Sequence, residues 1–312
     1  MLTLQPKSPT MAILFDSFEE WRHACTDRHL PAWMPVVEYE IAQKGRTEEQ
    51  IWLGVAHAYR VMCEAIDTGL TQDMVSFSGM INNGAKKVKN CTINVLDDNF
   101  RKLLYRTIAA KELNSCMGRI VAAPTAGASG IMPGIMYHLQ DIHQLPDRTI
   151  HEAMLVAAGV ALIIEKRASI AGAVGGCQAE TGTAAAMGAA AIVYSLGGSV
   201  DQMFEAVAIT IMNMLGLICD PIAGLVEVPC VKRNASAAVI AYSSAQIALA
   251  GDGAVIPVDE VIDVMGEVGE SMETRYKETA LGGLAATPTG QAIAARVLNP
   301  KAETLLPEDL AD

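Results

Sequence analysis

Helix signals dominate the pattern of apolar and polar positions along the chain, and the two-residue alternation of a half-buried strand is almost absent. Two capping boxes, in each of which a hydroxyl residue is followed three positions later by glutamine, indicate helix starts. They are Thr47 with Gln50 and Ser199 with Gln202. The first predicts a helix to about Thr68, before Gly69. The second predicts a helix to about Ile218, which Asp220-Pro221 should end because proline disfavours helix in the residue before it.

Four further segments carry helical periodicity or helix-start residues. They are residues 97–115, 147–167, 231–250 and 257–270. The first mixes apolar and charged positions in a way that suits an exposed amphipathic helix. In the second, Asp147 is placed to act as the N-terminal cap. Gly251 is expected to end the third.

The composition supplies the material for a large core. Hydrophobic residues make up 51% of the 312 residues and aromatic residues only 5%, so Ala, Val, Ile, Leu and Met are expected to fill the core. We therefore predict an all-α fold: a compact multi-helix catalytic domain with buried Ala/Gly-rich helices and glycine-rich site loops. It is expected to be a single domain over residues 1–312, in which N-terminal helices of residues 1–75 pack on a catalytic core of residues 76–296.

The charge limits the classes of partner. A net charge of −12 and a pI near 5.0 repel phosphate backbones and anionic lipids, so neither nucleic acid nor a membrane surface is expected as a partner. Residues 168–200 carry a single charge, Glu180, but they are rich in Gly and Ala rather than Leu. Buried helices explain this stretch better than a membrane span. Since the N-terminus lacks the pattern of a secretory signal, a cytoplasmic location is expected.

Seven cysteines, odd in number and irregularly spaced, do not form the pattern of a disulfide framework. Four lie in ordinary helical or connecting sequence and are expected to be small buried hydrophobes: Cys25, Cys63, Cys91 and Cys116. Cys177, Cys219 and Cys230 lie instead at predicted helix boundaries beside Gly or Pro, where a thiolate can point into a cavity. Because no CxxC is present, spacing leaves two interpretations open. The three are structural cysteines, or they bind a [4Fe–4S] cluster with one open iron.

Two motifs around these cysteines resemble the iron–sulfur-dependent (PLP-independent) L-serine dehydratases. One is Cys-Asp-Pro-Ile-Ala-Gly-Leu-Val-Glu-Val-Pro-Cys at residues 219–230, and the other is Gly-Gly-Cys-Gln-Ala-Glu at residues 175–180. Three further stretches are similar to the same family: Val-Lys-Arg-Asn at 231–234, Pro-Thr-Ala-Gly at 124–127 and Tyr-Lys-Glu-Thr-Ala-Leu-Gly-Gly-Leu-Ala at 276–285. The resemblance covers about residues 76–296 and is to the separate α chain of the two-subunit type.

This resemblance implies an activity and a cofactor. Cys177, Cys219 and Cys230 would each bind one iron of a [4Fe–4S] cluster, and the fourth iron would take the substrate. The implied reaction is the elimination of water from L-serine to give pyruvate and ammonia, in amino-acid degradation and gluconeogenesis, without PLP. A metal helps the poor hydroxyl leaving group to depart, while a base removes the weakly acidic Cα proton.

Two departures from longer members of the family concern partners. Single-chain members carry an additional domain with a Ser-Ser-His-Thr-like motif that contributes to the serine site, and nothing like it occurs here. Some relatives end in a cysteine that reaches the open iron, whereas this chain ends at Asp312. The resemblance therefore implies a separate β subunit within an oligomer, and the α chain alone is expected to have little or no activity.

The substrate-binding residues are predicted with the help of the resemblance. They are Pro124, Thr125, Ala126, Gly127 and Asn234. Backbone N–H groups of the Pro124–Gly127 turn, at a helix start, would hold the substrate carboxylate. Arg233 either orients the cluster or substrate or forms a structural ion pair.

The catalytic base stays open. His138, His143 and Lys232 are the main candidates, His151, Glu180 and Lys277 complete the set, and the β subunit is another possible source. Each histidine is also explained as a surface residue or a satisfied helix residue.

Three other functions are weighed against the dehydratase. A cysteine desulfidase would eliminate sulfide on the same kind of cluster, and the shape of the substrate site would decide between the two. A non-catalytic iron–sulfur subunit is disfavoured because a purely structural cluster normally has all its ligands. A PLP enzyme would need a Schiff-base lysine in an α/β fold, which the lack of readable strands disfavours.

Overall fold

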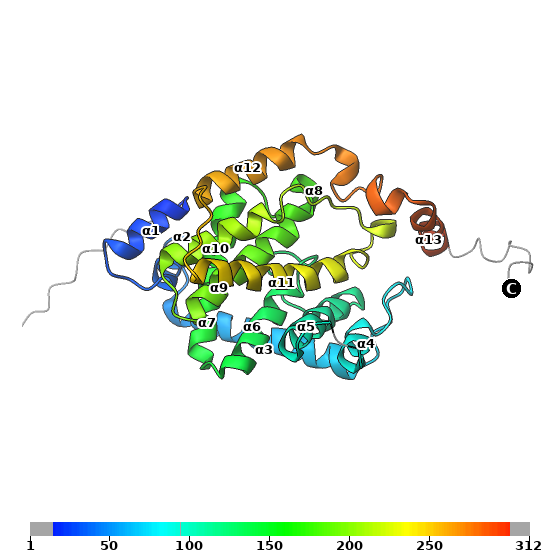
Figure 1. Ribbon diagram of the computed structural model, residues 1–312, viewed down its shortest axis with the longest axis horizontal. Helices are drawn as coiled ribbons and strands as arrows, with labels where there is room; N and C mark the ends of the chain where they lie inside the picture. Colours follow the sequence, from blue (N-terminus) through cyan, green and yellow to red (C-terminus); the bar gives the residue numbers. More distant parts are fainter. Residues whose placement is uncertain (1–14, 94, 300–312) are drawn as a thin grey trace, which may run out of the picture.

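The computed structural model describes residues 15–93 and 95–299 (Figure 1). Within these ranges there is no β-strand, and the two β-bridges are isolated pairs, so the predicted all-α class is confirmed. The α-helices are α1 Phe18–Thr26, α2 Trp33–Lys44, α3 Glu48–Thr71, α4 Gly84–Asn90, α5 Asp98–Ser115, α6 Ile131–His143, α7 Asp147–Arg167, α8 Gly172–Gly175, α9 Thr183–Ser195, α10 Val200–Met212, α11 Cys230–Leu249, α12 Val258–Ser271 and α13 Pro288–Leu298. The shorter turns are a π-helical turn, η1 Gln178–Gly182, and three 3-10 turns, η2 Ile222–Gly224, η3 Thr274–Tyr276 and η4 Gly283–Ala286.

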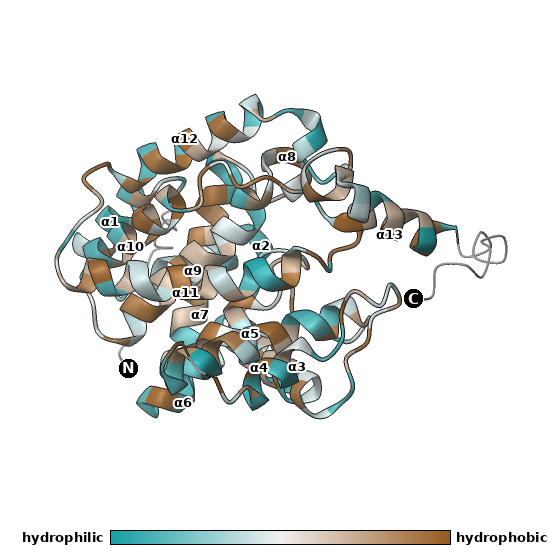
Figure 2. Ribbon diagram, turned by 45° about the vertical axis from the view of Figure 1, so that its right-hand side comes forward, coloured by the Kyte–Doolittle hydropathy of each residue, from teal (hydrophilic) through white to brown (hydrophobic). Residues whose placement is uncertain are grey.

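Helix α9 lies in the middle of the bundle, packed against α6, α7, α10 and α11 (Figure 1). All of its residues except Tyr194 are buried, and a helix that is apolar on every side needs such a shell of neighbours. Small residues allow the close packing: a Cβ on Gly188 would lie 2.3 Å from Cδ1 of Ile135. Figure 2 shows α9 mostly brown to pale, whereas α12, on the outside, alternates between brown and teal. No helix in the described residues is long and apolar enough to span a bilayer.

Helix α5 has the predicted span but not the predicted exposure. It packs between α3, α4, α6 and α11, and it buries Arg106, Lys111 and Glu112. Arg106 pairs with Asp141 at 2.6 Å, and Glu112 accepts two backbone N–H groups at the start of α4. Charged groups can be buried when they have such partners. The expectation of an exposed helix was wrong because the sequence shows the charges but not their partners.

Both capping boxes are present, which confirms the predicted starts of α3 and α10. Their ends differ from the prediction: α3 continues through Gly69 to Thr71, and α10 ends at Met212 rather than near Ile218. A Cβ on Gly69 would lie 2.3 Å from the carbonyl oxygen of Ala109 on α5. This glycine therefore permits a close helix crossing and does not end the helix.

Helix α7 spans the predicted residues, but its cap differs. Pro146 is the N-cap residue, and Asp147 is the first helical residue without a capping hydrogen bond. The Asp147 carboxylate instead accepts a hydrogen bond of 2.7 Å from the side-chain amide of Gln140 on α6. The carboxylate is still well placed, because negative charge is favourable in the first turn of a helix. Helices α11 and α12 begin and end within one residue of their predicted bounds.

The N-terminal helices pack on the rest of the bundle through aromatic side chains. Trp21 of α1 is fully buried, with its ring centroid 5.3 Å from that of Phe204 on α10. A Cβ on Gly159 of α7 would lie 2.6 Å from the Trp21 ring, so the glycine makes room for the indole. The division at residues 75 and 76 stays a prediction.

Candidate functional site

Three loops carry the buried thiols of Cys177, Cys219 and Cys230, which are 2%, 2% and 5% exposed. Cys177 begins the π-helical turn and follows Gly176, whose φ of +76° favours glycine. Cys219 is held in an extended pairing, exchanging two backbone hydrogen bonds with residues 276–278. Cys230 is the first residue of α11. The predicted helix boundary is present at Cys177 and Cys230, whereas Cys219 lies in a loop because α10 already ends at Met212.

Two of the thiols lie close to a carboxylate. The Sγ atoms of Cys177 and Cys219 and a carboxylate oxygen of Glu180 all lie within 4.8 Å of one another. Cys230 is near enough for charges on Cys177 and Glu180 to raise its pKa. All three cysteines are free thiols. The backbone of α8 packs against one of them, since a Cβ on Gly172 would lie 3.3 Å from the Cys219 Sγ.

The three thiols differ in their electrostatics. Hydrogen bonding with Cys219 lowers the pKa of Cys177 despite its burial, and the Arg233 guanidinium adds to this effect. The same hydrogen bond and burial raise the pKa of Cys219 far above its ordinary value. Burial raises the pKa of Cys230 to about 12. A metal bound by these thiols would supply the positive charge that stabilises all three as thiolates.

Arg233 of α11 connects the cysteine loops. Its Nη1 lies 3.5 Å from the Cys177 Sγ and 2.8 Å from Oδ1 of Asp220, and it donates to the carbonyl oxygen of Ile218 at 2.9 Å. Asp220 is 1% exposed, and its other oxygen accepts the backbone N–H of Leu284 at 2.7 Å. The pair thus ties the Cys219 loop to α11 and to η4. The sequence pattern marks Asp220 only as a helix end, so its buried pairing was missed.

The Pro124–Gly127 turn packs directly against Glu180. The Thr125 hydroxyl donates to the Glu180 carboxylate, and a Cβ on Gly127 would lie 2.3 Å from Oε1 of Glu180. On its other side Asn234 donates to the carbonyl oxygen of Gly127 at 2.9 Å and accepts the N–H of Gly130 at 3.0 Å. The predicted substrate-binding residues therefore form one contiguous unit beside the thiols. Their role in binding stays a prediction.

Two buried polar groups near this unit were missed in the sequence. Lys111 of α5 donates to the carbonyl oxygen of Ala126 at 3.2 Å. Glu227, in the loop before Cys230, accepts hydrogen bonds from the hydroxyls of Ser76 and Ser78 at 2.6 and 2.5 Å. No local motif marks either group, because each acquires its partners only when distant segments pack.

The candidate bases lie in different surroundings. His138 is buried, with Nδ1 3.0 Å from Arg106 Nη1 and its ring edge-on to Tyr242. Burial and the Arg106 charge lower the pKa of His138 to about 4. His143 ends α6 and is exposed, Lys232 is exposed on α11, His151 packs edge-on to Tyr59, and Lys277 donates to the carbonyl oxygen of Glu270. Of the six candidates, Glu180 is the one grouped with the cysteine ligand atoms. The base role of His138, His143 or Lys232 stays a prediction.

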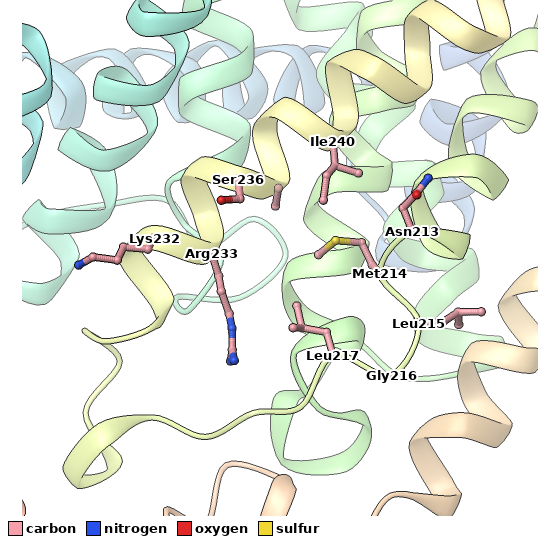
Figure 3. A pocket seen from close by; sticks show the side chains of 10 residues that line it. Asn213, Met214, Leu215, Gly216, Leu217, Lys232, Arg233, Ser236 and Ile240 are labelled. Carbon is pink, nitrogen blue, oxygen red and sulfur yellow. The ribbon is translucent and has the colours of Figure 1, made fainter. Parts of the chain in front are cut away.

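A pocket of about 500 Å³ lies between α11 and the turn of residues 213–217. Figure 3 shows Arg233 extending from α11 on the side of Leu217, whereas Lys232 points the other way. Because Arg233 both lines this pocket and contacts Cys177, the pocket borders the cysteine site. Of its two cationic lining residues, Arg233 is paired with Asp220 and Lys232 points away.

Comparisons with known proteins agree with this geometry. A family model described as "Serine dehydratase alpha chain" matches residues 27–285. The L-serine dehydratase alpha chain of Peptoniphilus asaccharolyticus is 44% identical over 272 residues, which cover 86% of this chain and 93% of that one. A probable L-serine dehydratase alpha chain of Bacillus subtilis is 42% identical, covering 83% of this chain and 87% of that one. The L-serine dehydratase of Streptomyces coelicolor is 37% identical, and the match covers 77% of this chain but 54% of that one.

Proposed function

Because the chain belongs to the serine dehydratase alpha chain family, we propose that it is the α subunit of an L-serine dehydratase that holds a [4Fe–4S] cluster on Cys177, Cys219 and Cys230. The reaction removes the Cα proton and the β-hydroxyl of L-serine as water. The resulting aminoacrylate tautomerises to an imine, which water hydrolyses to pyruvate and ammonia. The observation that supports the proposal most strongly is the grouping of two buried thiols, Cys177 and Cys219, within 4.8 Å of each other and of Glu180, with the buried thiol of Cys230 near enough for charge on Cys177 to raise its pKa.

The donor set fits such a cluster. Iron–sulfur clusters are bound by cysteine thiolates, and at Gly172 the backbone comes so close to the Cys219 sulfur that an added Cβ would lie 3.3 Å from it. Arg233 supplies a cation and a donor to Cys177, as is typical of the groups that orient metal ligands. The Arg233–Asp220 pair holds the segment that carries Cys219 against the helix that Cys230 begins. The donor set is therefore braced by buried side chains on two sides.

When bound, the cluster supplies a Lewis-acidic iron that helps the β-hydroxyl of L-serine to depart. The protein residues position the rest of the substrate. Asn234 fixes the Pro124–Gly127 turn, whose backbone faces the site, and Thr125 orients the Glu180 carboxylate. Holding the reacting groups in one orientation lowers the entropic part of the barrier.

We also propose a separate β subunit as a partner. The match covers 93% of one alpha chain but only 54% of the longer L-serine dehydratase of Streptomyces coelicolor, so nearly half of that protein lies outside the match. Two segments that brace the cysteine loops expose large apolar side chains, Phe77 at 86% and Leu281 at 71%. Phe77 lies between the two serines bound to Glu227, and Leu281 precedes the backbone that Asp220 holds. A β subunit that covers them would complete the substrate site.

Anaerobic reconstitution with iron and sulfide tests the proposal. We expect about four irons per chain and a charge-transfer absorption in the wild type, and loss of both in Cys219→Ala, because the ligand set is incomplete. Cys25→Ala is the matched control, since Cys25 is equally buried but packs in the hydrophobic core. Addition of the β subunit should then give pyruvate from L-serine. A wild-type chain that binds no iron under these conditions would sink the proposal.

A further inference from the structure

Lys111 of α5 is a fully buried lysine without an acidic partner. Its side chain is 0% exposed, and its Nζ donates to Oδ1 of Asn114 and to the carbonyl oxygen of Ala126. Both acceptors are neutral. Within residues 15–93 and 95–299, no carboxylate oxygen lies close enough to the Lys111 ammonium, at 4.0 Å or less, to form an ion pair with it. Since an ammonium has three N–H donors, these two hydrogen bonds leave one for a ligand.

Keeping a charge at this position is costly. Burial lowers the pKa of Lys111 to about 8, even though Cys230, Glu180 and Glu227 lie near enough to raise it. An apolar side chain of similar length would fill the same space without the desolvation cost. Because both hydrogen-bond acceptors of Lys111 are neutral, its third N–H can donate to an anionic ligand.

The position of Lys111 indicates which anion this is. Lys111 holds the carbonyl oxygen of Ala126, while the neighbouring Thr125 holds the carboxylate of Glu180. A cation and an anion thus contact adjacent residues of one turn. A free α-amino acid carries a carboxylate and an ammonium on one carbon, so its two charges match this arrangement.

We propose that Lys111 binds the α-carboxylate of the amino-acid substrate, with the substrate ammonium directed towards Glu180. The proposal rests on the proposed dehydratase function and adds the residue that selects amino acids with a free carboxylate. A charge-assisted hydrogen bond in a dry site gives both affinity and selectivity. A ligand without the negative charge would leave the Lys111 ammonium unpaired.

The test uses the reconstituted enzyme of α and β chains, with Lys111→Met and Lys111→Arg as variants. Iron content and the visible spectrum are measured first. We then compare KM for L-serine with the inhibition constant of L-serinamide, which lacks the carboxylate. In Lys111→Met we expect KM for L-serine to rise about 10- to 100-fold while the serinamide constant changes little. Lys111→Arg should retain much of the preference for L-serine over L-serinamide, because arginine keeps the positive charge.

Lys102→Met is the matched control. Lys102 lies on the same helix but pairs with Asp98 at the surface, so its loss should leave the preference for L-serine unchanged. If Lys111→Met keeps its iron and prefers L-serine over L-serinamide as strongly as the wild type, the role of Lys111 is refuted while the dehydratase function stands. Carboxylate binding by Lys111 is also refuted if both Lys111 variants lose kcat with KM unchanged, which indicates a base. Absence of iron from the wild type would refute the dehydratase function instead.

Discussion

The centre of the bundle and the cysteine site are both buried, yet they are built from opposite materials. Around α9 the buried residues are mostly Ala, Val, Ile and Met, and the packing depends on volume alone. Around the thiols the buried residues include Lys111, Glu180, Asp220 and Glu227, and the packing depends on which donor meets which acceptor. Burial by itself therefore does not locate the functional site in this protein. Buried charge alone does not locate it either, because Arg106 and Glu112 of α5 are buried with structural partners.

Substitution of one glycine in the candidate site and one in the helix core tests this difference, because the first should mainly lower activity and the second mainly lower stability. Gly127→Ala would place a Cβ within 2.3 to 2.5 Å of the three carboxyl atoms of Glu180. The carboxylate or the turn must move, and small displacements of positioning groups have large effects on rate. We expect kcat/KM to fall about 100-fold in the reconstituted enzyme, with a smaller effect on stability. Gly54→Ala is the control, since nothing lies within 4 Å of a Cβ there.

Gly134→Ala should show the reverse pattern. Its Cβ would lie 2.0 Å from Oγ1 and 2.9 Å from Cα of Thr107, where α6 crosses α5. A backbone contact cannot rotate away, so we expect a loss of about 1–3 kcal/mol in the free energy of unfolding, measured by urea titration. Gly188→Ala is the comparison within the core, because its clash is with the terminal methyl of Ile135, which can rotate. If Gly134→Ala kept its stability but lost activity, the division between framework and site would be wrong.

The sequence was informative where a local motif decides the structure. Both capping boxes formed as predicted, because the N-cap hydroxyl and the glutamine three residues later satisfy each other's neighbouring N–H groups. The ends of the same helices were predicted less well. Gly69 was predicted to end α3, but it instead allows α3 to cross α5 closely. The local sequence does not show this crossing, because it depends on Ala109 in a different helix.

The residues of the candidate site also differ in how well the sequence predicts them. The three cysteines stand out in the sequence because they sit beside Gly and Pro in recognisable motifs. Lys111 does not stand out, since it occurs in a helix whose mixed charges look like an exposed face. Its burial results from α5 being covered by α11 and by the Pro124–Gly127 turn, which are long-range contacts. Sequence patterns therefore identify candidate ligands that have local signatures, but they miss a charge that tertiary packing buries.

The pH dependence of stability tests whether His138 belongs to the structural framework or to the candidate site. Its pKa is lowered from 6.5 to about 4 by burial and by Arg106, with Lys102 and His143 adding to the effect and Asp141 opposing it. Between these values the unfolded chain binds a proton that the folded chain does not. The free energy of unfolding should therefore fall as the pH drops from about 6.5 to about 4, while above 6.5 this contribution is constant.

The expected loss in that window is a few kcal/mol at most, and it is measured by urea unfolding of wild type and His138→Gln at several pH values. The variant lacks the titrating ring, so its stability should depend less steeply on pH in the same window. Groups far from His138 contribute equally to both proteins and cancel in the difference, whereas Asp141, whose pKa His138 helps to lower, does not. A framework role also requires that His138→Gln, assayed near pH 8 where it is folded, keeps most of its activity. A collapse of kcat there, without a change in iron content, would move His138 out of the framework and make it the base.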